Sequence, residues 1–309
     1  MPRHKTLLIF ALLPTLAACG LNVQTHHVSS PRPVPARTAS PATPGPNSNF
    51  SITPANPAQG DTVDLRFSFT HPPESISLLV NGQAQPFYPT GNGYRALLGT
   101  DPSSSTGTHQ VKLTATYQGG FATTSTSGFT LQPGSFATRT ITLPTNKTPL
   151  LSPAVGAQEV NLSESALSTR TLDQLWQGPF TLPLGNAPID SPYGYWGVYN
   201  GTPEWFHEGV DFTAAAGAPV HASATGVVVL SKALPRGGNT VIINHGQGVL
   251  SEYLHLETMA VQAGQTVTQG QIVGTVGSTG LTTGPGLHWA VFVNGIPVNP
   301  LLWATAPPG

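Results

Sequence analysis

Cysteine and charged residues are both scarce in this sequence of 309 residues. Cys19 is the only cysteine, so no disulfide can form within the chain. Charged side chains make up 8% of the residues, and the 12 basic and 13 acidic ones nearly cancel. Without a basic surplus or a basic face, nucleic acid is not an expected partner.

The first residues contain a short apolar stretch, Leu7 to Leu13, preceded by two basic residues. This order is typical of a secretory signal, and the stretch is too short to span a bilayer. The following residues, Leu16-Ala17-Ala18-Cys19, resemble the bacterial lipobox. The resemblance implies a signal peptide over residues 1–18 and a lipid anchor on Cys19 that holds the protein to a membrane of the cell envelope. Gly20 after the cysteine favours the outer membrane in a two-membrane cell.

Composition divides the rest of the chain. Residues 19–49 carry six prolines and almost nothing to bury, which predicts an extended tether. Residues 50–143 alternate apolar and polar side chains, with turn signals such as Asn81-Gly82, and this predicts antiparallel strands in an immunoglobulin-like sandwich. Residues 144–175 are polar and weakly patterned, as expected of a linker.

From residue 176 to 303, apolar runs alternate with glycine, which predicts a second β domain before a short tail at residues 304–309. No window shows sustained helical periodicity. The expected fold class is therefore all-β, with two β domains.

Three potential metal ligands lie in this second domain: His207, Asp211 and His288. Two imidazoles and one carboxylate occupy three corners of a zinc tetrahedron and leave the fourth to water, as in catalytic sites. On a regular strand His207 and Asp211 would be ~13 Å apart, so the backbone must bend between them. Gly209 and β-branched Val210 disfavour a helix, and we expect a kink at Gly209 that leads into a strand.

Three ordered motifs resemble those of the LytM and lysostaphin type of zinc endopeptidases, which cut peptide bonds in bacterial peptidoglycan. The motifs are His207 with Asp211, Tyr253-Leu254-His255-Leu256, and Thr283 through Trp289. The resemblance covers about residues 176 to 303. It implies a LytM-type β domain of duplicated hybrid motif-like fold, a zinc cofactor, and peptidoglycan as partner. It also implies metal binding by His207, Asp211 and His288, and a catalytic role for His255.

The sequence departs from the family pattern at Gly286, where the family has a second catalytic histidine. A positioned acid or base typically contributes 10²–10⁴-fold to the rate, so its loss predicts a slow enzyme more readily than an inactive one. Four side chains are candidates to replace the missing group: Glu208, Glu204, His221 and His245.

Two functions therefore remain open. The first is a tethered zinc endopeptidase, in which His255 either takes the proton of water or stabilises the oxyanion. The second, motivated by Gly286, is a non-hydrolytic protein that binds peptidoglycan or regulates another hydrolase. The sequence does not decide between glycine bridges and D-alanyl cross-links as the bond cut, and it predicts no oligomeric state.

Overall fold

The protein is described by a computed structural model over residues 48–305. The expected signal peptide, Cys19 and nearly all of the expected tether lie outside these residues, so they stay predictions. Within residues 48–305, no helix has the length and apolar character needed to cross a membrane.

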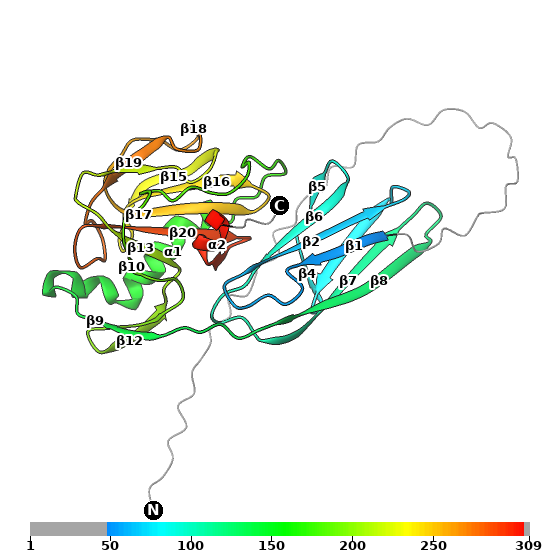
Figure 1. Ribbon diagram of the computed structural model, residues 1–309, viewed down its shortest axis with the longest axis horizontal. Helices are drawn as coiled ribbons and strands as arrows, with labels where there is room; N and C mark the ends of the chain where they lie inside the picture. The colour runs from blue at the N-terminus through cyan, green and yellow to red at the C-terminus, as the bar shows by residue number, and fades with distance from the viewer. Residues whose placement is uncertain (1–47, 306–309) are drawn as a thin grey trace, which may run out of the picture. The chain divides into compact units, whose positions relative to one another are not determined.

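The first folded region consists of two antiparallel sheets of four strands (Figure 1). One sheet has the order β1-β2-β6-β5 and the other the order β4-β3-β7-β8. The strand bounds are β1 Ser48–Thr53, β2 Thr62–Phe69, β3 Ser75–Val80, β4 Gln83–Ala84, β5 Tyr88–Thr90, β6 Gly93–Gly99, β7 Gly107–Thr116 and β8 Ala122–Leu131. Leu65 and Phe67 of one sheet share a core with Leu78, Leu113 and Phe129 of the other. The immunoglobulin-like topology of this sandwich stays a prediction.

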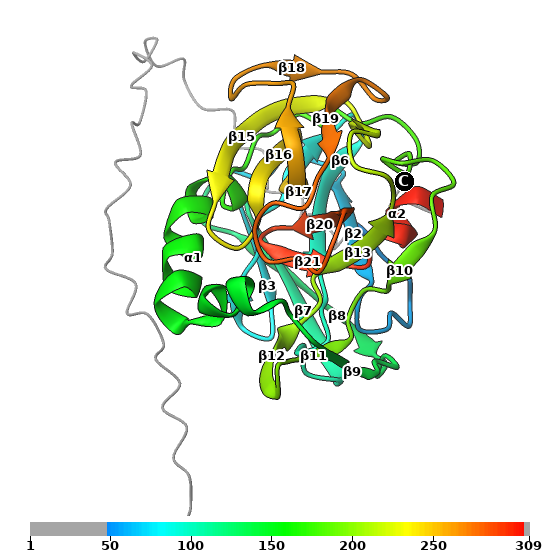
Figure 2. The ribbon, with the colours of Figure 1, turned by 90° about the vertical axis from the view of Figure 1, so that its left-hand side faces the viewer.

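The segment expected to be a linker contains two helices, the 3₁₀ helix η1 (Thr145–Leu151) and the α-helix α1 (Pro153–Leu167). Ser152 caps α1 by accepting a hydrogen bond from the amide of Val155 at 3.4 Å, and Pro153 occupies its first turn. Ala166, with Leu162 and Leu167, packs into an apolar cluster on the next domain. Figure 2 shows α1 beside β15.

The second domain is built on a sheet with the strand order β10-β13-β20-β17-β16-β15-β18. Its strands are β10 Ile189–Ser191, β13 Gly209–Thr213, β15 Gly226–Leu234, β16 Gly238–Gly246, β17 Val249–Met259, β18 Thr266–Val267 and β20 Gly286–Val293. Around it lie β14 Pro219–His221, β19 Ile272–Val276, β21 Ile296–Val298 and the helix α2, Pro300–Thr305. The molecule is thus mostly β, as predicted, and α1 is the principal exception.

Strand register decides which side chains share a face of this sheet. Asp211, His288 and Leu254 pair across β13, β20 and β17, and residues 209, 290 and 252 form the next row. Because paired residues point to the same face, both rows project from one side of the sheet. The residues between them, such as Trp289, point to the opposite side and are fully buried in its core.

A small three-stranded sheet, β12-β11-β9, stands beside the large one. Its strands are β9 Thr138–Ile141, β11 Trp196–Tyr199 and β12 Thr202–Phe206, and β9 runs parallel to β11. β9 follows the sandwich strands in the sequence and pairs with β11. A segment far upstream of the candidate ligands therefore contributes to the region around them.

Candidate metal centre and active-site groove

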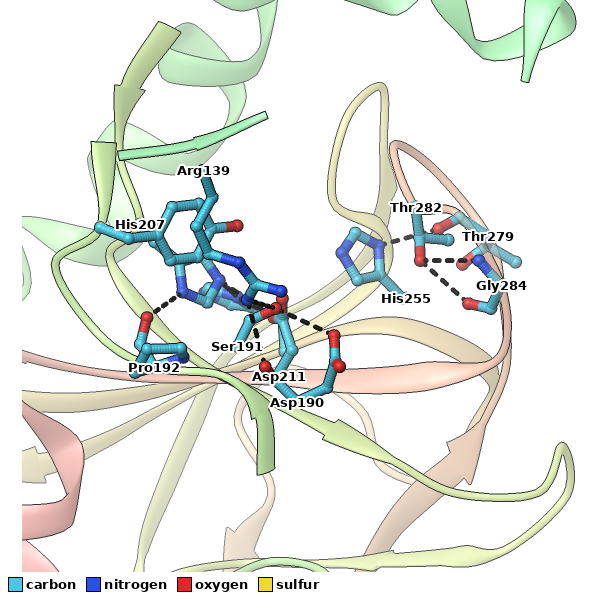
Figure 3. Close-up of polar contacts among 12 residues, drawn as sticks. Arg139, Asp190, Ser191, Pro192, His207, Asp211, His255, Thr279, Thr282 and Gly284 are labelled. Atoms are coloured by element: carbon cyan, nitrogen blue, oxygen red, sulfur yellow. Dashed lines mark hydrogen bonds and ion pairs between the residues drawn. The ribbon is translucent and has the colours of Figure 1, made fainter. Parts of the chain in front are cut away.

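The side chains of His207, Asp211 and His288 converge on one point of the large sheet. Figure 3 shows His207 and Asp211 at this point. Nε2 of His207 lies 3.0 Å from Asp211 Oδ1 and 3.0 Å from His288 Nδ1. His288 Nδ1 lies 2.9 Å from the same carboxylate oxygen. Three donor atoms of the types that bind zinc therefore face one another.

Local backbone structure explains this convergence. His207 and Glu208 connect β12 to β13, so the chain bends there and β13 begins at Gly209. A helix is absent from this segment, and Asp211 lies inside the strand, directly paired with His288. A Cβ at Gly209 would lie 2.8 Å from His288 Nε2 and 2.3 Å from the carbonyl oxygen of Trp289, so only glycine fits.

The donor set fits a zinc ion. Ligand bonds near 2.0–2.1 Å in a tetrahedron place neighbouring donors about 3.3 Å apart, within a few tenths of an ångström of the separations found here. Nδ1 of His207 lies 2.9 Å from the carbonyl oxygen of Pro192, to which it must donate its proton, so Nε2 keeps a lone pair for a metal. The Asp211 side chain is 34% exposed, which leaves the site open to solvent on one side.

The electrostatics of the three groups are coupled. Burial alone would raise the pKa of Asp211, but the hydrogen bonds and charges of His207 and His288 outweigh it, and the net pKa lies well below the usual range. Burial lowers the pKa of His288, and the hydrogen bond to Asp211 opposes this change only in part. At neutral pH the site therefore presents a carboxylate and a neutral His288, the protonation states that metal binding requires.

His255 lies on β17 beside the three ligands, with its ring centroid 6.4 Å from that of His288. The φ angle of His255 is 66°, in the left-handed region where residues other than glycine are uncommon. The register of β17 against β19 shifts just after this residue, between Leu256 and Thr258. Nδ1 donates to the carbonyl oxygen of Thr279 at 2.9 Å, leaving Nε2 as an acceptor. Burial lowers the pKa of His255 to about 4.

Gly286 begins β20 and pairs with Thr213, one row beyond the pair of Asp211 and His288. Positions 286 and 288 lie on the same face of the sheet, because alternate residues of a strand point to one side. A Cβ at position 286 would approach the carbonyl oxygen of Phe212 to 2.9 Å, so the local backbone is built around glycine.

The candidate replacements for the missing imidazole lie in different surroundings. Nδ1 of His221 contacts the carbonyl oxygen of Pro183 at 3.2 Å, away from the ligands. His245 is fully buried, and its Nε2 lies 2.7 Å from Ser251 Oγ, so it belongs to the core. Glu208 lines the groove described next, and the side chain of Glu204 lies outside the described set.

The candidate ligands lie in a groove of about 870 Å³. Sequence reasoning missed several of its walls: α1, β9 with Arg139, and the buried carboxyl group of Glu252 on β17. Burial raises the pKa of Glu252 to about 8 and that of Glu208 to about 7. A charged residue inside the apolar run of β17 was a visible signal for Glu252, whereas nothing near Arg139 marked it.

Part of the chain that lines this groove is similar to known proteins. Residues 205–300 match the model of peptidase family M23. The chain is 46% identical over 93 residues to peptidoglycan DD-endopeptidase ShyA of Vibrio cholerae, covering 30% of this chain and 22% of that protein. It is 41% identical over 134 residues to DD-carboxypeptidase/endopeptidase Mpg of Neisseria meningitidis, covering 43% of this chain and 31% of that protein. The chain thus spans less than one third of either relative.

A solved structure resembles more of the chain. A Pseudomonas aeruginosa protein described as a peptidase M23 superposes with a TM-score of 0.56 over 82% of this chain and 96% of that one. Their sequences are 22% identical, so this likeness concerns the fold alone.

Proposed function

Residues 205–300 form a peptidase family M23 domain, and from this premise we propose that the protein is a zinc-dependent endopeptidase that hydrolyses peptide cross-links of bacterial peptidoglycan. The observation that carries the proposal is the convergence of His207 Nε2, Asp211 Oδ1 and His288 Nδ1 within 3.0 Å of one another. These three residues would hold the ion, which supplies Lewis-acid polarisation of a carbonyl and lowers the pKa of water toward ~7.

His255 is the proposed general base. Its Nδ1 proton is engaged with Thr279, so Nε2 can accept a proton from the attacking water. The water oxygen bonds to the carbonyl carbon, the carbon–nitrogen bond breaks, and the proton passes to the leaving nitrogen. The low pKa of His255 keeps the imidazole neutral, as a base must be at the start of the reaction.

Gly286 sets the expected rate. With one imidazole instead of two, hydrolysis would be roughly 10²–10⁴-fold slower than at a site with both groups. The same glycine supports the second candidate function, a non-hydrolytic protein that binds peptidoglycan or regulates another hydrolase. We place either activity in the cell envelope, on the expectation that Cys19 carries a lipid and residues 19–49 act as a tether.

Zinc content and release of muropeptides from purified peptidoglycan test this proposal. We expect one zinc per chain, slow release of soluble muropeptides with new amino groups, and loss of release on chelation. His255→Ala should retain zinc and lower the rate by at least ~10²-fold. His207→Ala should lose the metal.

His71→Ala is the matched control, since His71 is an exposed residue of the sandwich and its variant should behave as the parent does. Stoichiometric zinc without muropeptide release would contradict the hydrolase and favour the regulator. Failure of the parent to bind zinc would contradict the hydrolase, and it would leave only a regulator that uses the groove without a metal.

A further inference from the structure

Arg139 brings a cation to the candidate metal centre from outside the matched region. It lies on β9 and lines the groove. Its Nη1 donates to Ser191 Oγ at 2.9 Å and to the carbonyl oxygen of Asp190 at 3.1 Å, and its guanidinium carbon lies 5.2 Å from the centroid of the Tyr195 ring. Two hydrogen bonds and a cation–π contact therefore hold the guanidinium in a defined position.

Both neighbours of this guanidinium also touch metal ligands. Ser191 pairs with Asp211 across β10 and β13. The Tyr195 ring stacks on the His207 ring, with centroids 4.6 Å apart and an interplanar angle of 28°. Figure 3 shows the hydrogen bonds of Arg139 to Ser191 and Asp190 in the same view as His207 and Asp211. A peptide held at the three ligands would thus lie within reach of the Arg139 guanidinium.

No carboxylate of the described residues neutralises the positive charge of Arg139. Among residues 48–305, no Asp or Glu carboxylate forms an ion pair with Arg139, and its described hydrogen bonds use Nη1 alone. The nearby Asp190 carboxylate accepts from Ser191 Oγ instead. Nε and Nη2 remain as donors for a ligand.

The other arginines that line the groove donate hydrogen bonds to backbone carbonyl groups of the protein. Arg236 donates to the carbonyl oxygens of Leu150 and Leu151 in η1, and Arg170 donates to those of Leu167 and Thr169. A guanidinium is permanently charged and presents a planar fork of donors that matches a carboxylate. Arg139 is therefore the arginine of this groove best placed to receive an anionic group of the substrate.

The chemistry of a peptide cross-link says where such an anion can be. The residue on the acyl side has used its own carboxyl group in the scissile bond. The residue on the amine side can carry a free carboxylate on the carbon next to the amide nitrogen, as when D-alanine is joined directly to an amine-bearing carbon of a diamino acid. A link within an oligoglycine bridge has no carboxylate at that position, because each glycine carboxyl group continues the chain.

We propose that Arg139 binds the free carboxylate of the residue that supplies the leaving amine, and that the site thereby selects direct D-alanyl cross-links over glycine bridges. This inference rests on the proposed hydrolysis of cross-links and names the bond that is cut. It makes β9, upstream of the peptidase M23 domain, a determinant of specificity.

The test compares three synthetic cross-linked peptide dimers. The first joins D-alanine to an amine whose carbon bears a free carboxylate, the second carries a carboxamide in its place, and the third has an oligoglycine bridge. Zinc-loaded full-length protein is assayed for hydrolysis, with kcat and KM determined separately, and for binding by calorimetry. The variants are Arg139→Gln, Arg139→Lys and the charge-matched control Lys112→Gln, at an exposed position of the sandwich.

A charge-assisted hydrogen bond of this kind is expected to favour the carboxylate dimer over the carboxamide dimer by about 10- to 100-fold in kcat/KM, mainly through KM. Arg139→Gln should reduce this ratio toward one. Arg139→Lys, which keeps the charge and loses the fork, should retain part of it. Lys112→Gln should keep the ratio of the parent protein.

An unchanged ratio in Arg139→Gln, or a parent protein with no preference, would overturn the inference. So would equal losses of kcat on both dimers, which would indicate a role in the reaction itself, or a lower melting temperature with the ratio intact, which would indicate a structural role. If no dimer is cleaved, the proposed function fails, but calorimetry still reports the preference for the carboxylate: a preference that depends on Arg139 supports the inference, and no preference overturns it.

Discussion

Replacing Gly286 by histidine tests whether the missing imidazole limits the proposed hydrolysis. A Cβ built at this position lies 2.9 Å from the carbonyl oxygen of Phe212, closer than real Cβ atoms approach other atoms. Because that oxygen belongs to the backbone of β13, a strand must shift before any larger residue fits. Gly286→Ala introduces the same Cβ without the imidazole, so it measures this steric cost alone.

We expect Gly286→Ala to lower the free energy of unfolding by about 1–3 kcal/mol, as overpacking of a well-packed site does. Gly286→His should lose the same amount of stability as Gly286→Ala. It should still release muropeptides at least ~10²-fold faster than Gly286→Ala, since a positioned acid or base contributes at least that factor. This factor corresponds to about 3 kcal/mol of barrier. Urea denaturation and chromatography of muropeptides at saturating zinc measure the two quantities.

Equal rates for Gly286→His and Gly286→Ala, with one zinc bound to each, would refute this reasoning. The missing imidazole would then not be what limits the reaction, and another group would already perform its role. Gly91→Ala is the matched control, since nothing lies within 4 Å of a Cβ built at Gly91 and this glycine belongs to the sandwich instead of the groove. Its rate and stability should equal those of the parent.

Three further changes have defined outcomes. Gly209→Ala places a Cβ 2.3 Å from the carbonyl oxygen of Trp289, so we expect zinc per chain, measured by atomic absorption, to fall well below that of Gly91→Ala. Equal zinc content in the two variants would contradict the geometry. Burial raises the pKa of Glu252 from 4.5 to about 8, so the unfolded chain ionises first and stability should fall as pH rises from about 4.5 to 8. Glu252→Gln should flatten this dependence by a few kcal/mol in urea denaturation at pH 5 and 9, and an unchanged slope would count against it. The Glu159 carboxylate accepts from the amides of residues 236 and 237 at 2.7 and 2.8 Å, so Glu159→Ala should expose α1 to limited proteolysis; unaltered cleavage would show that α1 is held by its apolar contacts alone.

Alternation of apolar and polar side chains predicted antiparallel strands within residues 50–143, because a half-buried strand repeats every two residues. Val111, Leu113 and Ala115 are each at most 2% exposed on β7, as the pattern required. The turn at Asn81-Gly82 has both φ angles positive, as the dipeptide predicted. Helix α1 could not be foreseen in the same way, because it buries few apolar side chains and the surface that receives them is formed by strands far along the chain. Its cap, Ser152 before a proline, was the one readable signal.

The ordered motifs located His207, Asp211 and His288, and their spacing predicted the bend before β13, but not the pairing of β13 with β20. Asp211 and His288 are 77 residues apart, and their contact depends on the register of β13 against β20. The left-handed backbone of His255 lies next to a register shift between β17 and β19, and no local sequence pattern indicates such a shift. Arg139 was missed because it is contributed by β9, whose partner strand lies more than fifty residues downstream.

The origin of the groove walls bears on how the protein can be dissected. A fragment that starts at Trp176 would keep the three potential ligands and lose β9, η1 and α1. The sheet face now covered by Ala166 would expose Leu250 and Phe292 to water, so such a fragment should tend to self-associate. If the chain hydrolyses cross-links as proposed, activity measured on the trimmed piece would lack the contribution of Arg139 on β9 to the choice of substrate.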